Sequence, residues 1–281
     1  MMVPATSFDR YGEEPASPVV LSVPHAGRDY PLALRTALRV PLAALLTLED
    51  RHVDSLALAA RGSETLLVQR RARAWIDLNR AEHDRDPRID DGAQPASLPQ
   101  LSAKVRSGLG LVPRRASGGD IYCRRFDASE IAARIAADHR PYHETLTAAL
   151  ARARARFGVA VLLDVHSMPS LPAKDGAQIV FGDRFGRSAG TRYVHRLEAE
   201  AAAAGVRHAL NSPYAGGHIL DRHARPDAGI HAVQIEFDRA LYLDQRGDAP
   251  GAGLEPLARL LRRMIDAVAD EALTPLAQAA E

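Results

Sequence analysis

Two histidines follow apolar runs that predict buried strands, and their matching settings suggest metal chemistry. His25 ends the run PVVLSVPHAG at residues 18–27, and His166 ends the run VAVLLDVHSM at residues 159–168. Such runs are typical of strands buried on both faces of a parallel sheet, and open α/β sheets bind ligands at the carboxyl ends of their strands. Side chains in a strand repeat every two residues, so Asp164 and His166 share a face. We therefore predict that His25 and His166 contribute to one shared metal site.

A carboxylate ligand is expected from the acidic cluster within residues 41–61, a segment that predicts a helix ending at Gly62. Asp50 is the first choice and Glu49 and Asp54 are the alternatives, although all three could simply lie on a solvated helix face. Two imidazoles, one carboxylate and an open position for water are a ligand set that suits catalytic zinc. We therefore predict one Zn²⁺ per chain. The sequence has no HExxH motif, which excludes the helix-borne metal site of the common metalloproteases.

Glu236 is the candidate general base. It lies in the apolar run AVQIEF at residues 232–237, and burying a carboxylate between Ile235 and Phe237 is costly without a function or a partner. A base at this position would accept a proton from metal-bound water. The alternative is a half-buried glutamate on an edge strand, paired with Arg239.

Arg80 is the first candidate for binding an anionic substrate. It follows Asn79 after a predicted strand at residues 74–78. A guanidinium in this place could hold a substrate carboxylate with two hydrogen bonds. The alternative is a structural salt bridge with Asp77 or Asp84.

Three more candidates for substrate binding lie elsewhere in the chain: Arg140, Arg239 and His218. His218 follows two glycines in the predicted loop at residues 211–225. Gly216 and Gly217 would let this loop close over a substrate, or they could serve a plain turn.

Composition limits the classes of protein to which the chain can belong. Its 281 residues are 46% hydrophobic and 25% charged, which is typical of a globular protein, and the net charge of +1 argues against a nucleic-acid footprint. The single cysteine, Cys123, excludes an intrachain disulfide and a cysteine-built zinc site. No run approaches the roughly 18 apolar residues that a membrane span needs, and the N-terminus lacks a signal-peptide pattern. We therefore expect a cytoplasmic protein that acts on a small molecule, without a nucleic acid or a membrane as partner; the sequence reveals no protein partner.

The elements that must position these residues alternate between strand and helix. Predicted strands occupy residues 19–23, 64–69, 74–78, 159–168, 178–182, 206–210 and 232–237, and predicted helices occupy residues 41–61, 126–157, 188–204 and 254–272. Pro141 predicts a kink or break in the second helix, and the long polar stretch at residues 81–119 is expected to cover the site. This order predicts an α/β fold with a mixed, mainly parallel sheet sandwiched by helices.

Seven stretches carry a resemblance to a known family. They are SVPHAGRDYP (22–31), EDRHVDSL (49–56), WIDLNR (75–80), HRPYHETL (139–146), LLDVHSM (162–168), NSPYAGGHI (211–219) and VQIEFDRALYLD (233–244). Together and in this order, they resemble the N-formylglutamate amidohydrolase family, which is similar to the zinc carboxypeptidase and aspartoacylase group. The resemblance implies a zinc-exopeptidase-like fold with about eight strands between helices, and a single catalytic domain over residues 1–281.

The resemblance also implies roles for the metal-site residues. His25 and His166 match the family's zinc-binding histidines, Asp50 matches the carboxylate ligand, and Glu236 matches the carboxypeptidase-type general base. The related carboxypeptidases carry a glutamate three residues after the first histidine. Arg28 occupies that position here, so the third ligand must come from elsewhere.

The implied substrate is a short N-acyl amino acid. Asn79 and Arg80 match the pair that holds the substrate carboxylate in the aspartoacylase group. The best expectation is zinc-dependent hydrolysis of N-formyl-L-glutamate to formate and L-glutamate. The alternatives are a hydrolase for another N-acyl amino acid or small peptide, and a non-catalytic anion-binding domain on the same scaffold.

Overall fold

The chain forms two compact units, and it passes between them several times. Unit 1 comprises residues 1–9, 24–51 and 67–145, and unit 2 comprises residues 10–23, 52–66 and 146–281. The structure is a computed structural model that describes residues 6–93, 101–172 and 176–274. A single catalytic domain over residues 1–281 stays a prediction.

The main sheet is built around unit 2, and its central strands are the apolar runs that predict buried strands. In sheet order, the seven strands that the described residues contribute to this sheet are β1 (Phe8–Tyr11), β3 (Thr65–Gln69), β2 (Val19–Val23), β6 (Ala160–Met168), β9 (Ile230–Asp238), β7 (Ile179–Gly182) and β8 (His208–Leu210). β2 pairs with β6, β6 with β9 and β7 with β8 in parallel, whereas β7 and β9 are antiparallel. All residues of β2 and β6 are buried, as expected for strands covered on both faces.

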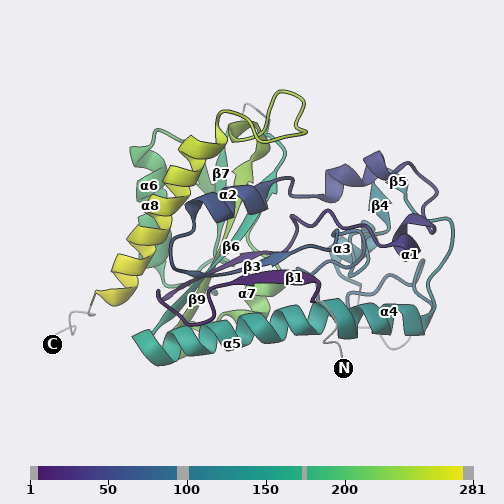
Figure 1. The fold of residues 1–281 in the computed structure, drawn as a ribbon, viewed down its shortest axis with the longest axis horizontal. Helices are drawn as coiled ribbons and strands as arrows, with labels where there is room; N and C mark the ends of the chain where they lie inside the picture. Colours follow the sequence, from purple (N-terminus) through teal and green to yellow (C-terminus); the bar gives the residue numbers. More distant parts are fainter. Residues whose placement is uncertain (1–5, 94–100, 173–175, 275–281) are drawn as a thin grey trace. The chain divides into compact units, whose positions relative to one another are not determined.

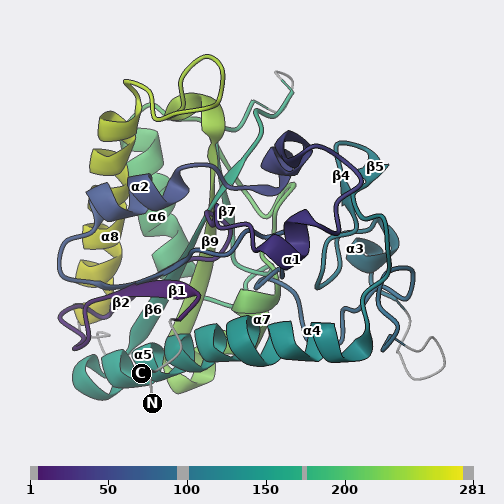
Figure 2. The same ribbon diagram turned by 45° about the vertical axis from the view of Figure 1, so that its right-hand side comes forward.

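Helices cover both faces of this sheet in unit 2. The helices α2 (Val53–Ala60), α6 (Thr191–Ala203) and α8 (Leu254–Leu273) pack together on one face, where α8 contacts β2 and β6 (Figures 1 and 2). The helix α7 (His218–His223) packs against β9 on the other face. The predicted fold, a mixed and mainly parallel sheet between helices, is therefore confirmed.

Unit 1 consists mostly of short elements and turns. Its elements are the helix α1 (Leu32–Arg35), the 3₁₀ helix η1 (Leu42–Leu48), the helix α3 (Ala103–Arg106), the hairpin of β4 (Arg115–Ala116) and β5 (Gly119–Asp120), the helix α4 (Ala128–Arg134), the π-helical turn η3 (Ile135–His139) and the start of α5 (Arg140–Phe157). The polar stretch at residues 81–119 thus contains α3 and the first strand of this hairpin; its residues 94–100 lie outside the described residues.

Two sequence predictions of regular elements are wrong. The predicted helix at residues 41–61 is interrupted between η1 and α2, because Glu49 is extended and His52 has a positive φ of 57°. Asp50 therefore lies in an irregular segment, where its backbone N–H donates to the carbonyl of His25. The predicted strand at residues 74–78 is a series of turns.

The long helix predicted at residues 126–157 is confirmed, and it continues through Pro141 without a break. Asp127 and Glu130 form a capping box at its N-terminus. α4, η3 and α5 then follow one another without a gap, and the π-helical turn ends two residues before Pro141. A wider turn accommodates a residue that has no N–H and whose ring crowds the preceding turn.

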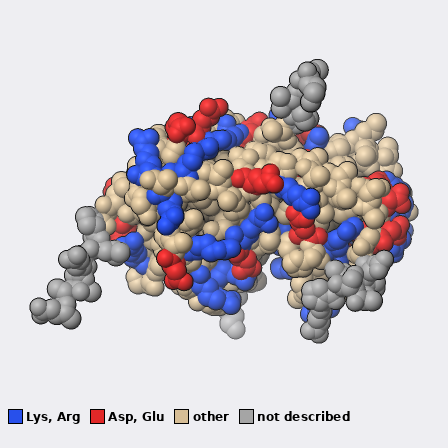
Figure 3. Space-filling view, turned by 90° about the horizontal axis from the view of Figure 1, so that it is seen from below, with Lys and Arg blue, Asp and Glu red and all other residues tan. Residues whose placement is uncertain are grey.

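Acidic and basic side chains are mixed on the surface. On the face seen in Figure 3, Lys and Arg side chains lie among Asp and Glu side chains. Ion pairs such as Arg263 with Glu200 and Arg124 with Glu130 belong to this pattern. None of the described helices is long and apolar enough to cross a membrane.

Candidate active site

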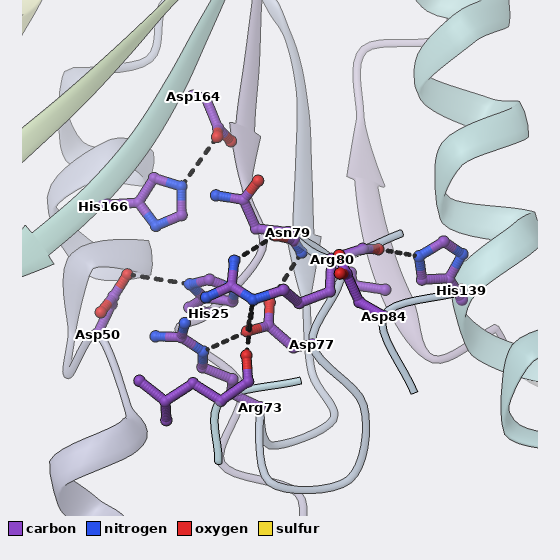
Figure 4. Close-up of polar contacts among 12 residues, drawn as sticks. His25, Asp50, Arg73, Asp77, Asn79, Arg80, Asp84, His139, Asp164 and His166 are labelled. Carbon is purple, nitrogen blue, oxygen red and sulfur yellow. Dashed lines mark hydrogen bonds and ion pairs between the residues drawn. The ribbon is translucent and has the colours of Figure 1, made fainter. Parts of the chain in front are cut away.

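His25 is fixed from two sides in unit 1. It follows β2, and only 2% of its surface is exposed. Its Nε2 lies 2.7 Å from Oδ1 of Asp77, and its Nδ1 lies 3.6 Å from Oδ2 of Asp50 (Figure 4). An ionised carboxylate only accepts hydrogen bonds, so Nε2 donates to Asp77. Nδ1 is then unprotonated in the neutral ring, and its lone pair lies on the side of the ring that is next to Asp50.

Asp77 is the carboxylate that orients His25. Burial alone would raise its pKa, but the neighbouring Arg73, His25 and Arg80 outweigh burial and hold the pKa of Asp77 well below its usual range. Its oxygens also accept hydrogen bonds from Arg73 Nε at 2.9 Å and from the backbone N–H of Asn79 at 2.8 Å. Asp77 therefore connects His25 to the start of the Asn79–Arg80 turn.

The geometry distinguishes Asp50 from the two alternative carboxylates. Glu49 is buried, but it accepts a hydrogen bond from the hydroxyl of Tyr30. Asp54 lies in the first turn of α2 and is half-buried. Asp50 lies beside the first histidine, with its Oδ2 3.6 Å from Nδ1 of His25.

His166 and Glu236 lie side by side in unit 2. They are register partners on the adjacent parallel strands β6 and β9, so both side chains project from the same face of the sheet. Nε2 of His166 lies 2.8 Å from Oδ2 of Asp164, whose Oδ1 accepts a hydrogen bond from Ser22 Oγ at 2.8 Å (Figure 4). Gln234 donates to Oε1 of Glu236 at 2.9 Å. The strands thus place an oriented imidazole beside a buried carboxylate.

These donor atoms suit a zinc ion. Ligand atoms about 2.1 Å from zinc at two corners of a tetrahedron are separated by about 3.4 Å, and the 3.6 Å between His25 Nδ1 and Asp50 Oδ2 is close to this value. In both histidines, a buried aspartate holds Nε2, which is how proteins orient imidazoles that bind a metal. Histidine and aspartate groups that could hold a metal ion are therefore present.

Arg80 is buried and partly engaged by the backbone of unit 1. Its Nε donates to the carbonyl of Leu109 at 2.8 Å, and its Nη1 donates to the carbonyl of Asn79 at 2.6 Å. Its Nε also lies 3.9 Å from Asp77, so the predicted salt bridge is present as well. Nη2 donates to no acceptor among the described residues.

The other predicted substrate-binding residues lie in different settings. Arg140 is exposed and forms a two-point ion pair with Glu82, with N–O distances of 2.9 and 2.8 Å. Arg239 is half-buried after β9, and its Nε donates to Ser167 Oγ at 3.1 Å. His218 is half-buried at the first position of α7.

The glycines before His218 serve the approach to α7, which occupies part of the predicted loop at residues 211–225. Gly216 has a φ of 105°, and a Cβ atom there would lie 2.5 Å from the Leu220 side chain. A side chain at Gly216 would therefore disturb both the backbone and the packing of α7.

The orienting aspartates are the residues that the sequence predictions did not assign to the site. Asp164 was expected only to share a face with His166, and the spacing Asp-x-His on one strand is a signal for such a pair. Asp77 is 52 residues from His25 and lies in a turn, so no local pattern connects the two.

Comparisons with known proteins identify the family of the chain. Residues 17–243 match a family model described as N-formylglutamate amidohydrolase. An N-formylglutamate deformylase from Pseudomonas aeruginosa is 33% identical over 257 residues, which cover 88% of this chain and 90% of that protein. A protein of the same description from Pseudomonas putida is 33% identical over 236 residues, with coverages of 81% and 82%.

A solved structure agrees with this result. The crystal structure of an N-formylglutamate amidohydrolase from Ralstonia eutropha superposes with a TM-score of 0.84 at 32% identity, and the match covers 95% of this chain and 98% of that one. A gene product of Agrobacterium tumefaciens shares the fold, with a TM-score of 0.65 at 20% identity over 95% of this chain and 96% of that one.

Proposed function

The chain belongs to the N-formylglutamate amidohydrolase family, and we propose that it uses one zinc ion to hydrolyse N-formyl-L-glutamate to formate and L-glutamate. Family membership makes it an amidohydrolase. The substrate follows from relatives that are named N-formylglutamate deformylase. The observation that carries the mechanism is the register of β6 and β9, which sets Glu236 beside a histidine whose Nε2 is held by an aspartate.

His25, Asp50 and His166 would hold the zinc, in line with the resemblance of their sequence stretches to the family. A bound zinc ion supplies Lewis acidity, which polarises the formyl carbonyl and lowers the pKa of a water molecule towards about 7. Asp77 and Asp164 keep the Nε2 atoms protonated, so that the lone pair of each imidazole lies on Nδ1.

Glu236 would move the proton. It accepts one proton as the water oxygen attacks the formyl carbon, and it delivers that proton to the nitrogen of the leaving amino group as the C–N bond breaks. Gln234 donates to Oε1 of Glu236 at 2.9 Å, which helps to hold the carboxylate in one orientation.

Asn79, Arg80, Arg140, His218 and Arg239 are the proposed substrate-binding residues. Arg80 has the strongest support, because its Nε and Nη1 are held by backbone carbonyls while Nη2 remains for a substrate carboxylate. Arg140 would have to exchange its ion pair with Glu82 for the substrate. Fixing the carboxylates would fix the angle at which water attacks.

The experiment that tests this proposal combines metal analysis with formate release. Purified protein is assayed with N-formyl-L-glutamate before chelation, after chelation and after Zn²⁺ is added back. We expect about one zinc per chain and formate release that is lost on chelation and restored by zinc.

Other outcomes separate the alternatives. Bound zinc without formate release would indicate that the substrate is another N-acyl amino acid or a small peptide, which a substrate panel would identify. Binding of glutamate by metal-free protein without any turnover would support an anion-binding domain instead.

A further inference from the structure

Two buried histidines on the long helix of unit 1 hold the turn that carries Asn79 and Arg80. Nε2 of His139 lies 2.8 Å from the carbonyl oxygen of Arg80, and Nε2 of His143 lies 3.0 Å from the carbonyl oxygen of Leu78. Neither histidine has any exposed surface, and their ring centroids are 4.4 Å apart. Figure 4 shows His139 pointing at the turn. A carbonyl can only accept, so both imidazoles donate through Nε2.

The helix is shaped to present both rings to the same turn. His139 and His143 are four residues apart, which places them on one helix face. The π-helical turn at residues 135–139 accommodates Pro141 between them, so the helix continues instead of breaking. π-helical turns inside α-helices are frequent at functional sites.

The turn itself depends on such external donors. Residues 77–80 belong to neither a helix nor a strand, and buried carbonyls outside regular structure need donors from side chains or water. On its other side, the turn is fixed by the hydrogen bond from the Asn79 N–H to Asp77. The two histidines therefore hold the backbone carbonyls on both sides of Asn79, those of Leu78 and Arg80.

We infer that His139 and His143 are positioning residues, which hold the Asn79–Arg80 turn in the conformation that binds a substrate carboxylate. This inference rests on the proposed function, because it requires Arg80 to contact the substrate. The histidines act through the turn: loss of a donor leaves a buried carbonyl unpaired and allows the peptide to rotate, which moves the Arg80 guanidinium. The result is weaker substrate binding, with the zinc site left intact.

The test compares H143L with H143Q. Leucine removes the donor, whereas the side-chain amide of glutamine places an N–H near the position of Nε2. We expect H143L to raise KM for N-formyl-L-glutamate about tenfold, which corresponds to one unpaired buried carbonyl, with a smaller change in kcat and unchanged zinc content. H143Q should recover most of the affinity. H139L and H139Q form the second pair if H143L does not fold in a thermal melt.

A double-mutant cycle separates positioning from general damage. If His143 acts through Arg80, then H143L should raise KM far less in an R80K background than in the wild-type enzyme. Y142F is the matched control, because Tyr142 is fully buried on the same helix but its hydroxyl contacts the carbonyl of Leu67 at 3.5 Å. Y142F should keep the wild-type KM.

The possible failures are distinguishable. Wild-type protein that carries zinc but releases no formate would contradict the proposed function. Wild-type turnover together with an H143L enzyme whose KM equals that of Y142F, or with strictly additive effects of H143L and R80K, would overturn the positioning role alone.

Discussion

His25 and His166 each donate a ring proton to a buried aspartate, but the two pairs are built differently. His166 and Asp164 are two residues apart on β6, so the geometry of the strand sets their contact. His25 and Asp77 are 52 residues apart, and Asp77 lies in a turn. In the strand pair, His166 and Asp164, the sheet positions both residues. In the turn pair, His25 and Asp77, other side chains must hold the aspartate in place.

The surroundings of the two aspartates reflect this difference. Asp164 has a neutral partner, Ser22, which is on the neighbouring strand β2. Asp77 is surrounded by the cations Arg73 and Arg80 in addition to His25. A neutral donor therefore accompanies the aspartate whose backbone the sheet fixes, and cations accompany the aspartate that lies in a turn. The two pairs should therefore respond differently to the same substitution.

The largest effect is expected at Glu236, the carboxylate beside the strand pair. E236Q keeps the shape and the contact with Gln234 but removes the base, so kcat should fall about 1,000-fold while zinc content stays near one per chain. Formate release and metal analysis on the same sample measure both quantities. E64Q is a matched control, since Glu64 is another buried glutamate of unit 2 but pairs with Arg262. Retained turnover in E236Q would remove Glu236 as the base.

D77N should affect both metal binding and stability. Zinc affinity should fall about 10- to 100-fold, because His25 loses its orienting carboxylate. The free energy of unfolding should fall by about 3 kcal/mol, because the substitution leaves buried cations without their counter-charge. Chelator competition and urea unfolding of the metal-free protein measure the two effects. A stability equal to that of the wild type would show that the charges around Asp77 do not assemble this pair.

D164N should be the milder counterpart. Asparagine can still accept from His166 through its oxygen and donate to Ser22 through its amide, so stability should change by less than about 1 kcal/mol. Zinc affinity should fall about tenfold, at the lower end of the range for an orienting partner. The same two measurements apply. A loss of stability as large as that of D77N would contradict the contrast between the strand pair and the turn pair.

The same contrast explains how much of the molecule could be predicted from sequence. The strands that carry His166 and Glu236 are long apolar runs, so β6 and β9 and the shared face of Asp164 and His166 follow from local pattern. The Asp50 segment was predicted as a helix, because its composition does not reveal the positive φ of His52 that interrupts it.

Contacts distant in sequence had no such signal. The hydrogen bond from the Asp50 N–H to the His25 carbonyl and the contact of His25 with Asp77 arise from tertiary structure. The role of His143 is of the same kind, since its partner is a backbone carbonyl 65 residues away. Local pattern therefore predicts the contacts that a strand sets between near neighbours, and it does not predict contacts between residues that are distant in sequence.

The smallest predicted effect is the pH dependence of stability that His231 causes. In contrast to His25 and His166, which donate a ring proton, His231 accepts a hydrogen bond. This histidine was not assigned to the site, and it has a backbone donor as its partner: its Nδ1 accepts the N–H of Gly190 at 3.3 Å, and its ring packs at a tilt of 43° against Tyr193. Burial, assisted by the charge of Arg192, lowers the pKa of His231 to about 4. The ring is therefore neutral in the folded protein at pH values where the unfolded chain, with a pKa near 6.5, binds a proton.

The sign of the pH dependence follows from this difference. Between about pH 6.5 and pH 4 the unfolded state binds more protons, so the contribution of His231 to stability is complete above pH 6.5 and falls as the pH is lowered. From pH 7.5 to pH 5 the loss should be at most about 2 kcal/mol, because solvent screens part of the interaction. H231N keeps an acceptor for the Gly190 N–H but cannot titrate. Urea unfolding of metal-free wild type and H231N at both pH values should therefore show a steeper loss in the wild type, and equal losses would mean that His231 is not held neutral by the fold.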